Sequence, residues 1–97
     1  MDEDTSEEEL LNVIAKLNAD KQINGIIVQL PLPKQLNTNR IINAISPLKD
    51  VDGFHPYNTG MLQNNEQPYF IAATPLGVMK LIKSVNQNLS GKNVVLI

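Results

Sequence analysis

The chain contains no cysteine and only one histidine, His55, among its 97 residues. Without thiols it forms no disulfide and no thiolate metal site, and a single imidazole excludes a metal centre built from several histidines. No apolar run approaches the roughly 20 residues that span a bilayer. A formal net charge of -2 gives no electrostatic basis for binding nucleic acid or an anionic membrane. The composition, 42% hydrophobic and 19% charged, is that of a soluble globular protein, and we expect no metal.

The amino end, Met1–Asp4, is acidic where a secretory signal would be basic and then apolar. With the absence of cysteine, this makes the cytoplasm the expected location. An organellar location stays open, because the natural amino terminus can lie upstream of Met1.

The apolar run Gly25–Leu30 is rich in β-branched residues and predicts a buried strand of a parallel sheet. Because proline lacks an N–H group, pairing should stop before Pro31 and Pro33. Gln29 then falls at the carboxyl end of the strand, where open α/β sheets place their ligand clefts. From the residues alone, Gln29 is either placed for a ligand or is a polar group satisfied by a loop carbonyl.

Three amphipathic helices are expected around this strand. The first begins after Thr5 or Ser6, with a glutamate three residues on as in a capping box. The second begins near Asn37, and the third at Thr74, with threonine as the cap and the following proline at the first helical position. A second apolar strand is expected at Val94–Ile97. Alternating helices and strands predict an α/β fold with a parallel sheet.

Residues 47–60 are dense in Gly, Pro, Asp and Asn, which predicts a long irregular binding loop. Asp50 and Asp52 would point to the same side of an extended segment, but the calcium-loop pattern is absent. The two oxygens of a single carboxylate can accept hydrogen bonds from two adjacent N–H donors on the planar edge of a ligand such as an aminopyrimidine. The alternative is an aspartate that bonds its own loop backbone. We expect His55 to be a loop residue and Lys49 to lie on the surface.

Three sequence blocks support a family assignment: Val28-Gln29-Leu30-Pro31-Leu32-Pro33, Lys49-Asp50-Val51-Asp52-Gly53-Phe54-His55-Pro56-Tyr57-Asn58, and Thr74-Pro75-x-Gly77-Val78. In this order they resemble the bifunctional methylenetetrahydrofolate dehydrogenase/cyclohydrolase family over nearly the whole chain after Thr5. The resemblance implies part of an amino-terminal three-layer α/β folate domain in residues 1–73. It also implies an interdomain helix and turn in residues 74–90, and the first strand of a Rossmann-type domain in residues 91–97.

The same resemblance implies NADP-dependent oxidation of 5,10-methylenetetrahydrofolate to the methenyl form and its hydrolysis to 10-formyltetrahydrofolate, with NAD as the cofactor in some members. The implied ligands are tetrahydrofolate derivatives, and the implied full-length protein is a homodimer. By position, Gln29 would lie beside the catalytic lysine, and Asp52 would hold the amino and N–H edge of the pterin. Val28, Leu30 and Pro31 would line the substrate cleft.

Some family features are missing from this sequence. The Tyr-x-x-x-Lys segment that supplies the catalytic lysine is absent, as are the Gly-Arg-Ser-type phosphate loop and the Pro-Gly-Gly-Val-Gly-Pro segment. Ala73 stands where a cysteine is common. We therefore expect a fragment of a longer enzyme that is inactive alone. Two alternatives are a non-catalytic folate-binding or regulatory module, and a structural fragment stabilised by pairing with another chain.

Overall fold

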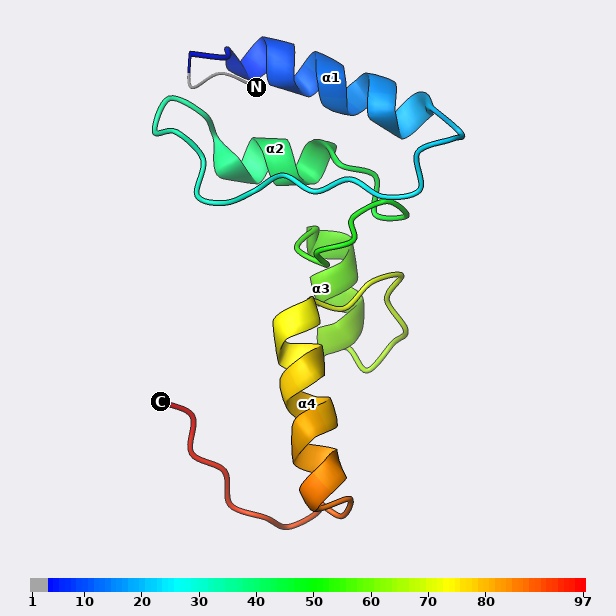
Figure 1. The fold of residues 1–97 in the computed structure, drawn as a ribbon, viewed down its shortest axis with the longest axis vertical. Coiled ribbons are helices and arrows are strands. Elements are labelled where there is room, and N and C mark those ends of the chain that lie inside the picture. Colours follow the sequence, from blue (N-terminus) through cyan, green and yellow to red (C-terminus); the bar gives the residue numbers. More distant parts are fainter. Residues whose placement is uncertain (1–3) are drawn as a thin grey trace.

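The computed structural model describes residues 4–97, so most of the acidic amino end lies outside the described residues. Its regular elements are the helices α1 (Glu7–Ala19), α2 (Thr38–Ala44), α3 (Pro56–Gln63) and α4 (Ala73–Val85). α1 and α2 lie side by side at one end of the molecule, α3 lies beneath them, and α4 leads away (Figure 1). The result is an elongated molecule of 49 × 31 × 22 Å.

The starts of the first two helices are those that the sequence predicts. Glu9 N donates to Ser6 Oγ at 3.3 Å and Ser6 N donates to the Glu9 carboxylate at 3.1 Å, which completes a capping box at α1. The bond from the Ser6 N–H holds the pKa of Glu9 below its usual value. At α2, the Asn37 side chain accepts a bond from Arg40 N at 3.1 Å.

The core lies where α1 and α2 meet the extended segment that joins them. Its fully buried apolar residues are isoleucines, one from α1, one from the extended segment, one from α2 and one just after α2: Ile14, Ile26, Ile41 and Ile45. Partly buried residues pack around them: Leu10, Leu11, Leu17, Ile23, Val28, Leu32 and Ala44. The helical spacing in the sequence predicts one buried face for the first helix, with Leu10, Val13, Ile14 and Leu17 on it. Three of these residues lie in or against the core, but Val13 is 37% exposed.

The strand predicted at Gly25–Leu30 is present only as a single parallel bridge between Ile26 and Asp50. Ile26 N donates to Lys49 O at 2.7 Å. A parallel ladder needs neighbours on both edges to pair its N–H and C=O groups, and among residues 4–97 only this pair forms. Ile27 is accordingly 61% exposed. The α/β sheet expected from the sequence is not formed within the described residues.

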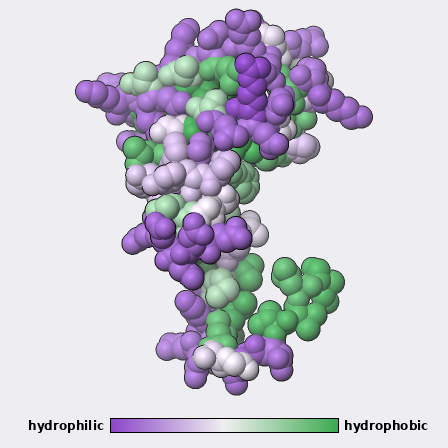
Figure 2. Space-filling model, turned by 180° about the vertical axis from the view of Figure 1, so that it is seen from behind, coloured by the Kyte–Doolittle hydropathy of each residue, from purple (hydrophilic) through white to green (hydrophobic). Residues whose placement is uncertain are grey.

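The carboxyl-terminal region is the least covered part of the molecule. Residues 94–97, predicted as a strand, are exposed and form no ladder, and they make an apolar lobe that stands apart from α4 (Figure 2). The apolar face of α4 is also exposed, at Val78, Leu81, Ile82 and Val85. Among residues 4–97, no helix has the length and apolar character needed to cross a membrane.

The start of α4 differs from the prediction. The helix begins at Ala73, with Ala72 as N-cap and no side-chain cap, so Thr74 is a residue of the first turn rather than the cap. The following proline fits this earlier start, because the first N–H groups of a helix have no intrahelical partner to lose.

Lys49 joins the end of α1 to the segment that leads into Asp50, a role that the sequence did not reveal. Its ammonium group donates to Leu17 O and Asn18 O at 2.8 Å and to Asp20 O at 2.7 Å. The last carbonyls of a helix lack intrahelical donors, and the helix dipole favours a cation at this end. Lys49 is thus a half-buried helix cap and not a free surface lysine.

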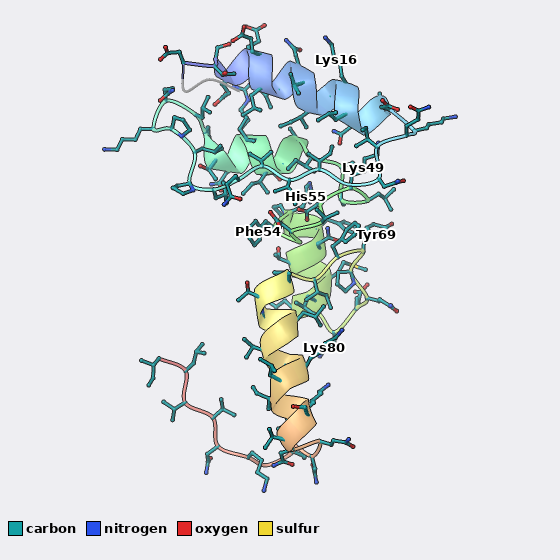
Figure 3. The ribbon with its side chains drawn as sticks, in the orientation of Figure 1. Lys16, Lys49, Phe54, His55, Tyr69 and Lys80 are labelled. Atoms are coloured by element: carbon teal, nitrogen blue, oxygen red, sulfur yellow. The ribbon has the colours of Figure 1, made fainter. Side chains whose placement is uncertain are left out.

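We expect Lys49→Met to lower the free energy of unfolding by about 1.5–3 kcal/mol, the range for hydrogen bonds to a charged group. Methionine keeps an unbranched apolar side chain but removes the donors. Urea unfolding followed by circular dichroism measures the loss. Lys16→Met is the matched control, because Lys16 lies exposed on the side of α1 that faces away from α2 (Figure 3), and it should change stability by no more than about 0.5 kcal/mol. Equal losses in the two variants would contradict the capping role.

Candidate functional site

The segment predicted as an irregular loop over residues 47–60 is a turn that leads into α3. The helix begins at Pro56, and the N-cap is His55, whose Nδ1 accepts a bond from Tyr57 N at 3.0 Å. Proline at the first helical position favours a helix start, but histidine is not a preferred N-cap, so the sequence carries only half of the usual signal. His55 is a helix cap with one ring nitrogen already engaged by the backbone.

Asp50 is almost fully buried, with 2% of its surface exposed. One carboxylate oxygen accepts bonds from His55 N and from Asn58 Nδ2, both at 2.9 Å, and the other accepts a bond from Phe54 N at 3.3 Å. Asp50 therefore follows the alternative considered for loop aspartates, since it bonds its own loop and the helix start that follows.

Asn58 is a residue of the site region that sequence reasoning missed. It is 1% exposed, and its amide nitrogen donates to Pro47 O at 3.1 Å as well as to Asp50. Its amide oxygen accepts a bond from Tyr69 N at 3.0 Å. Figure 3 shows Tyr69 beside α3, at the point where the returning chain is held. No local pattern marks an asparagine for this role, because its partners are far apart in the sequence.

Asp52 lies at the corner of the turn and is half-buried. Its carboxylate makes no hydrogen bond within residues 4–97, in contrast to Asp50 two positions earlier. It borders a depression of about 10 Å³, room for about one water molecule, whose other lining residues are Ile26, Val28, Ile42, Ile45, Asp50 and Phe54. The structure thus brings together two residues predicted for a ligand site, the carboxylate of Asp52 and the apolar side chain of Val28.

The other predicted site residues lie next to this depression along the chain but do not line it. Gln29 is exposed, and its amide nitrogen donates to Leu30 O at 3.1 Å, so a neighbouring carbonyl satisfies part of it. Leu30 is half-buried, and Pro31 borders a separate shallow pocket with Leu32 and nearby residues. Among residues 4–97, no group of three or more acidic, histidine or cysteine side chains is placed to hold a metal ion.

A family model described as the catalytic domain of tetrahydrofolate dehydrogenase/cyclohydrolase matches residues 1–52, a segment that includes both Gln29 and Asp52. This match covers more than half of the chain. The chain therefore belongs to the tetrahydrofolate dehydrogenase/cyclohydrolase family, as the three sequence blocks predicted.

Individual relatives agree. A bifunctional protein FolD from Geotalea daltonii is 55% identical over 94 residues, which are 97% of this chain and 33% of that protein. One from Aliarcobacter butzleri is 53% identical over 97 residues, which are 100% of this chain and 33% of that protein. The chain thus spans about a third of the length of the curated relatives it matches.

Two solved structures share the fold of this chain. The bifunctional enzyme FolD, a methylenetetrahydrofolate dehydrogenase/cyclohydrolase from Campylobacter jejuni, has a TM-score of 0.88 at 47% identity, over 93% of this chain and 32% of that one. A 5,10-methylenetetrahydrofolate dehydrogenase from the silkworm Bombyx mori has a TM-score of 0.84 at 44% identity, over 88% of this chain and 29% of that one.

Proposed function

We propose that this chain is the folate-binding part of an enzyme that oxidises 5,10-methylenetetrahydrofolate and hydrolyses the methenyl product to 10-formyltetrahydrofolate. Membership of the family supports the reaction class. The observation that carries the assignment of the site is the unpaired carboxylate of Asp52 at the edge of an apolar depression.

In this proposal, Asp52 binds the pterin. Its two oxygens accept hydrogen bonds from the exocyclic amino group and the adjacent ring N–H, which together form a planar fork of donors. Val28 and Phe54 line the same depression, and they would supply apolar contacts to the edge of the ring that lies over it.

Gln29 is proposed to act next to the reacting centre. It would contact the lysine of the family's Tyr-x-x-x-Lys segment and help to set the protonation of that lysine, while Leu30 and Pro31 extend the cleft wall. Release of the Gln29 amide from Leu30 O would free it for this contact. This chain supplies the amide and not the lysine, so its own contribution is to bind and orient.

The nicotinamide nucleotide, NADP or in some members NAD, supplies the hydride acceptor when bound. None of the five glycines of this chain belongs to a glycine-rich phosphate loop that follows a strand, so these residues do not fit a nucleotide site. We place that site in a Rossmann-type domain whose first strand is residues 91–97, reached through the interdomain segment 74–90 from the folate domain of residues 1–73. We expect the whole enzyme to be a cytoplasmic homodimer.

A chimera tests this function. Residues of this chain replace the matched third of the Campylobacter jejuni enzyme, and reduction of the nicotinamide nucleotide is followed with methylenetetrahydrofolate as substrate. We expect turnover by the chimera, because the host supplies the missing lysine and nucleotide site. A chimera that binds tetrahydrofolate without turnover would instead support the non-catalytic module.

Within the chimera, Asp52→Ala is expected to weaken tetrahydrofolate binding by about 1–3 kcal/mol, the range for loss of a buried charge-assisted hydrogen bond. Isothermal titration calorimetry measures the affinity. Glu66→Ala is the control, because Glu66 is an exposed carboxylate on the loop after α3 and should leave affinity unchanged. Unchanged affinity in the Asp52 variant would remove this residue from the site.

A further inference from the structure

Two of the most buried side chains in the described residues are polar, Asp50 and Asn58, and they bond each other at 2.9 Å. Burying a polar group costs free energy unless it is hydrogen-bonded, and burying a carboxylate costs more. Every buried side-chain nitrogen and oxygen in residues 4–97 has a partner, so the pair is fully satisfied. The pair lies beside a core of only four buried isoleucines and bonds four backbone groups, which would lose these partners if it were replaced by apolar residues.

The pair ties together segments that no regular element joins. Through Asp50 it holds the N–H groups of Phe54 and His55 at the start of α3. Through Asn58 it holds Pro47 O on one side and Tyr69 N on the other. We call these four hydrogen bonds and the Asp50–Asn58 bond the buried clip.

The turn that carries Asp52 lies inside the region that this clip fixes. Gly53 N donates to Asp50 O at 3.0 Å and closes the turn, so residues 51 and 52 form its corner. A Cβ on Gly53 would lie 2.7 Å from Ala72 N, which shows how closely the turn approaches the backbone before α4. On the other side, the Val51 side chain packs against Gly25.

The Asp52 carboxylate itself makes no bond in residues 4–97. Its position is therefore set by the turn backbone and not by contacts of its own side chain. A binding group of this kind gains affinity when its backbone is held before the ligand arrives, because less freedom is lost on binding.

We propose that Asp50 and Asn58 are positioning residues for folate binding, which hold the Asp52 turn through the buried clip. Asp50 borders the depression, but its carboxylate is engaged by Phe54 N, His55 N and Asn58 Nδ2 and is not left for the ligand. The proposal rests on the proposed function of Asp52. It explains why Asp50 and Asp52, two residues apart, have different roles. The Asp50 carboxylate is bonded by the protein, whereas the Asp52 carboxylate is left for the ligand.

The clip itself is tested in the 97-residue chain by amide hydrogen exchange, measured by NMR. In Asn58→Ala we expect faster exchange of the Tyr69 amide, because the substitution removes its acceptor. The amides of Phe54 and His55 should also exchange faster, because their acceptor, Asp50, loses its bond to α3. Gln63→Ala, an exposed residue of the same helix, is the control and should leave these amides unchanged. Unchanged exchange at all three amides in the Asn58 variant would overturn the clip. If Asn58→Ala does not fold, Asp50→Asn is the second test variant. It replaces one acceptor oxygen by a donor at nearly equal volume and should speed exchange of the same amides.

The link to the ligand is tested by a double-mutant cycle in the chimera. We expect Asn58→Ala to raise the KM for methylenetetrahydrofolate about tenfold, within the range for residues coupled through a backbone shift, with kcat little changed. In an Asp52→Ala background it should raise KM no further, because it acts through Asp52. Effects that multiply would show a general loss of structure and overturn the positioning role. An unsubstituted chimera without turnover would instead refute the proposed function, while hydrogen exchange still decides the clip.

Discussion

Ile41→Ala is expected to lower the free energy of unfolding by about 2–5 kcal/mol, the range for truncating a fully buried isoleucine. Ile41 is 0% exposed and packs between α1 and α2 against the other buried isoleucines. The loss combines apolar surface returned to water with a cavity that the helix pair closes only partly. Because a small domain is stabilised by about 5–15 kcal/mol in total, this single change removes a large share.

Urea unfolding monitored by circular dichroism measures the effect. Ile41→Val removes one methylene and should cost about 0.5–1.5 kcal/mol, which gives a graded series at one position. Ile27→Ala is the control, because Ile27 is the same residue type on the neighbouring segment but is 61% exposed. An equal loss of unfolding free energy in Ile27→Ala and Ile41→Ala would contradict this core, because it would mean that the face of the extended segment that carries Ile27 is buried as well.

The parts of the fold that were predictable from the sequence are those set by local signals. The capping box at Ser6 and the cap at Asn37 act within three residues of the helix start, and the apolar spacing selects Ile14 and Ile41 for the core. A strand is different, because its hydrogen bonds lie on other segments. The run at Gly25–Leu30 has the composition of a strand, yet only Asp50 pairs with it in the described residues.

The candidate site divides in the same way. Val28 and Asp52 were predicted together from sequence blocks, and they line one depression. Lys49 and Asn58 both stand in the second sequence block, but their roles were not identified. The carbonyls that Lys49 binds lie about 30 residues earlier, and Asn58 joins segments 11 residues away on both sides. Helix and strand periodicities describe neighbours within one element and not contacts between distant segments, so these roles are visible only in the three-dimensional structure.

Gly53→Ala is expected to destabilise the chain by about 2–5 kcal/mol, for two separate reasons. Gly53 has φ +68°, a left-handed conformation that costs an L-residue about 1–2 kcal/mol. An added Cβ would also lie 2.7 Å from Ala72 N and 2.9 Å from Ile71 C, and crowding against backbone adds about 1–3 kcal/mol because backbone cannot rotate away. Since Gly53 follows Asp52, the same substitution in the chimera should weaken tetrahydrofolate binding.

Two other glycines separate these causes. Gly91 has φ +71° but nothing within 4 Å of an added Cβ, so Gly91→Ala carries only the conformational cost of about 1–2 kcal/mol. Gly60 lies inside α3 with the same open space and an ordinary helical conformation, so Gly60→Ala should stabilise the chain by about 0.5–1 kcal/mol. Denaturant unfolding of the three variants should therefore rank Gly53 as the most damaging and Gly60 as stabilising. Equal costs at Gly53 and Gly91 would mean that the close approach to residues 70–72 does not hold the turn, and Asp52 would then need another support.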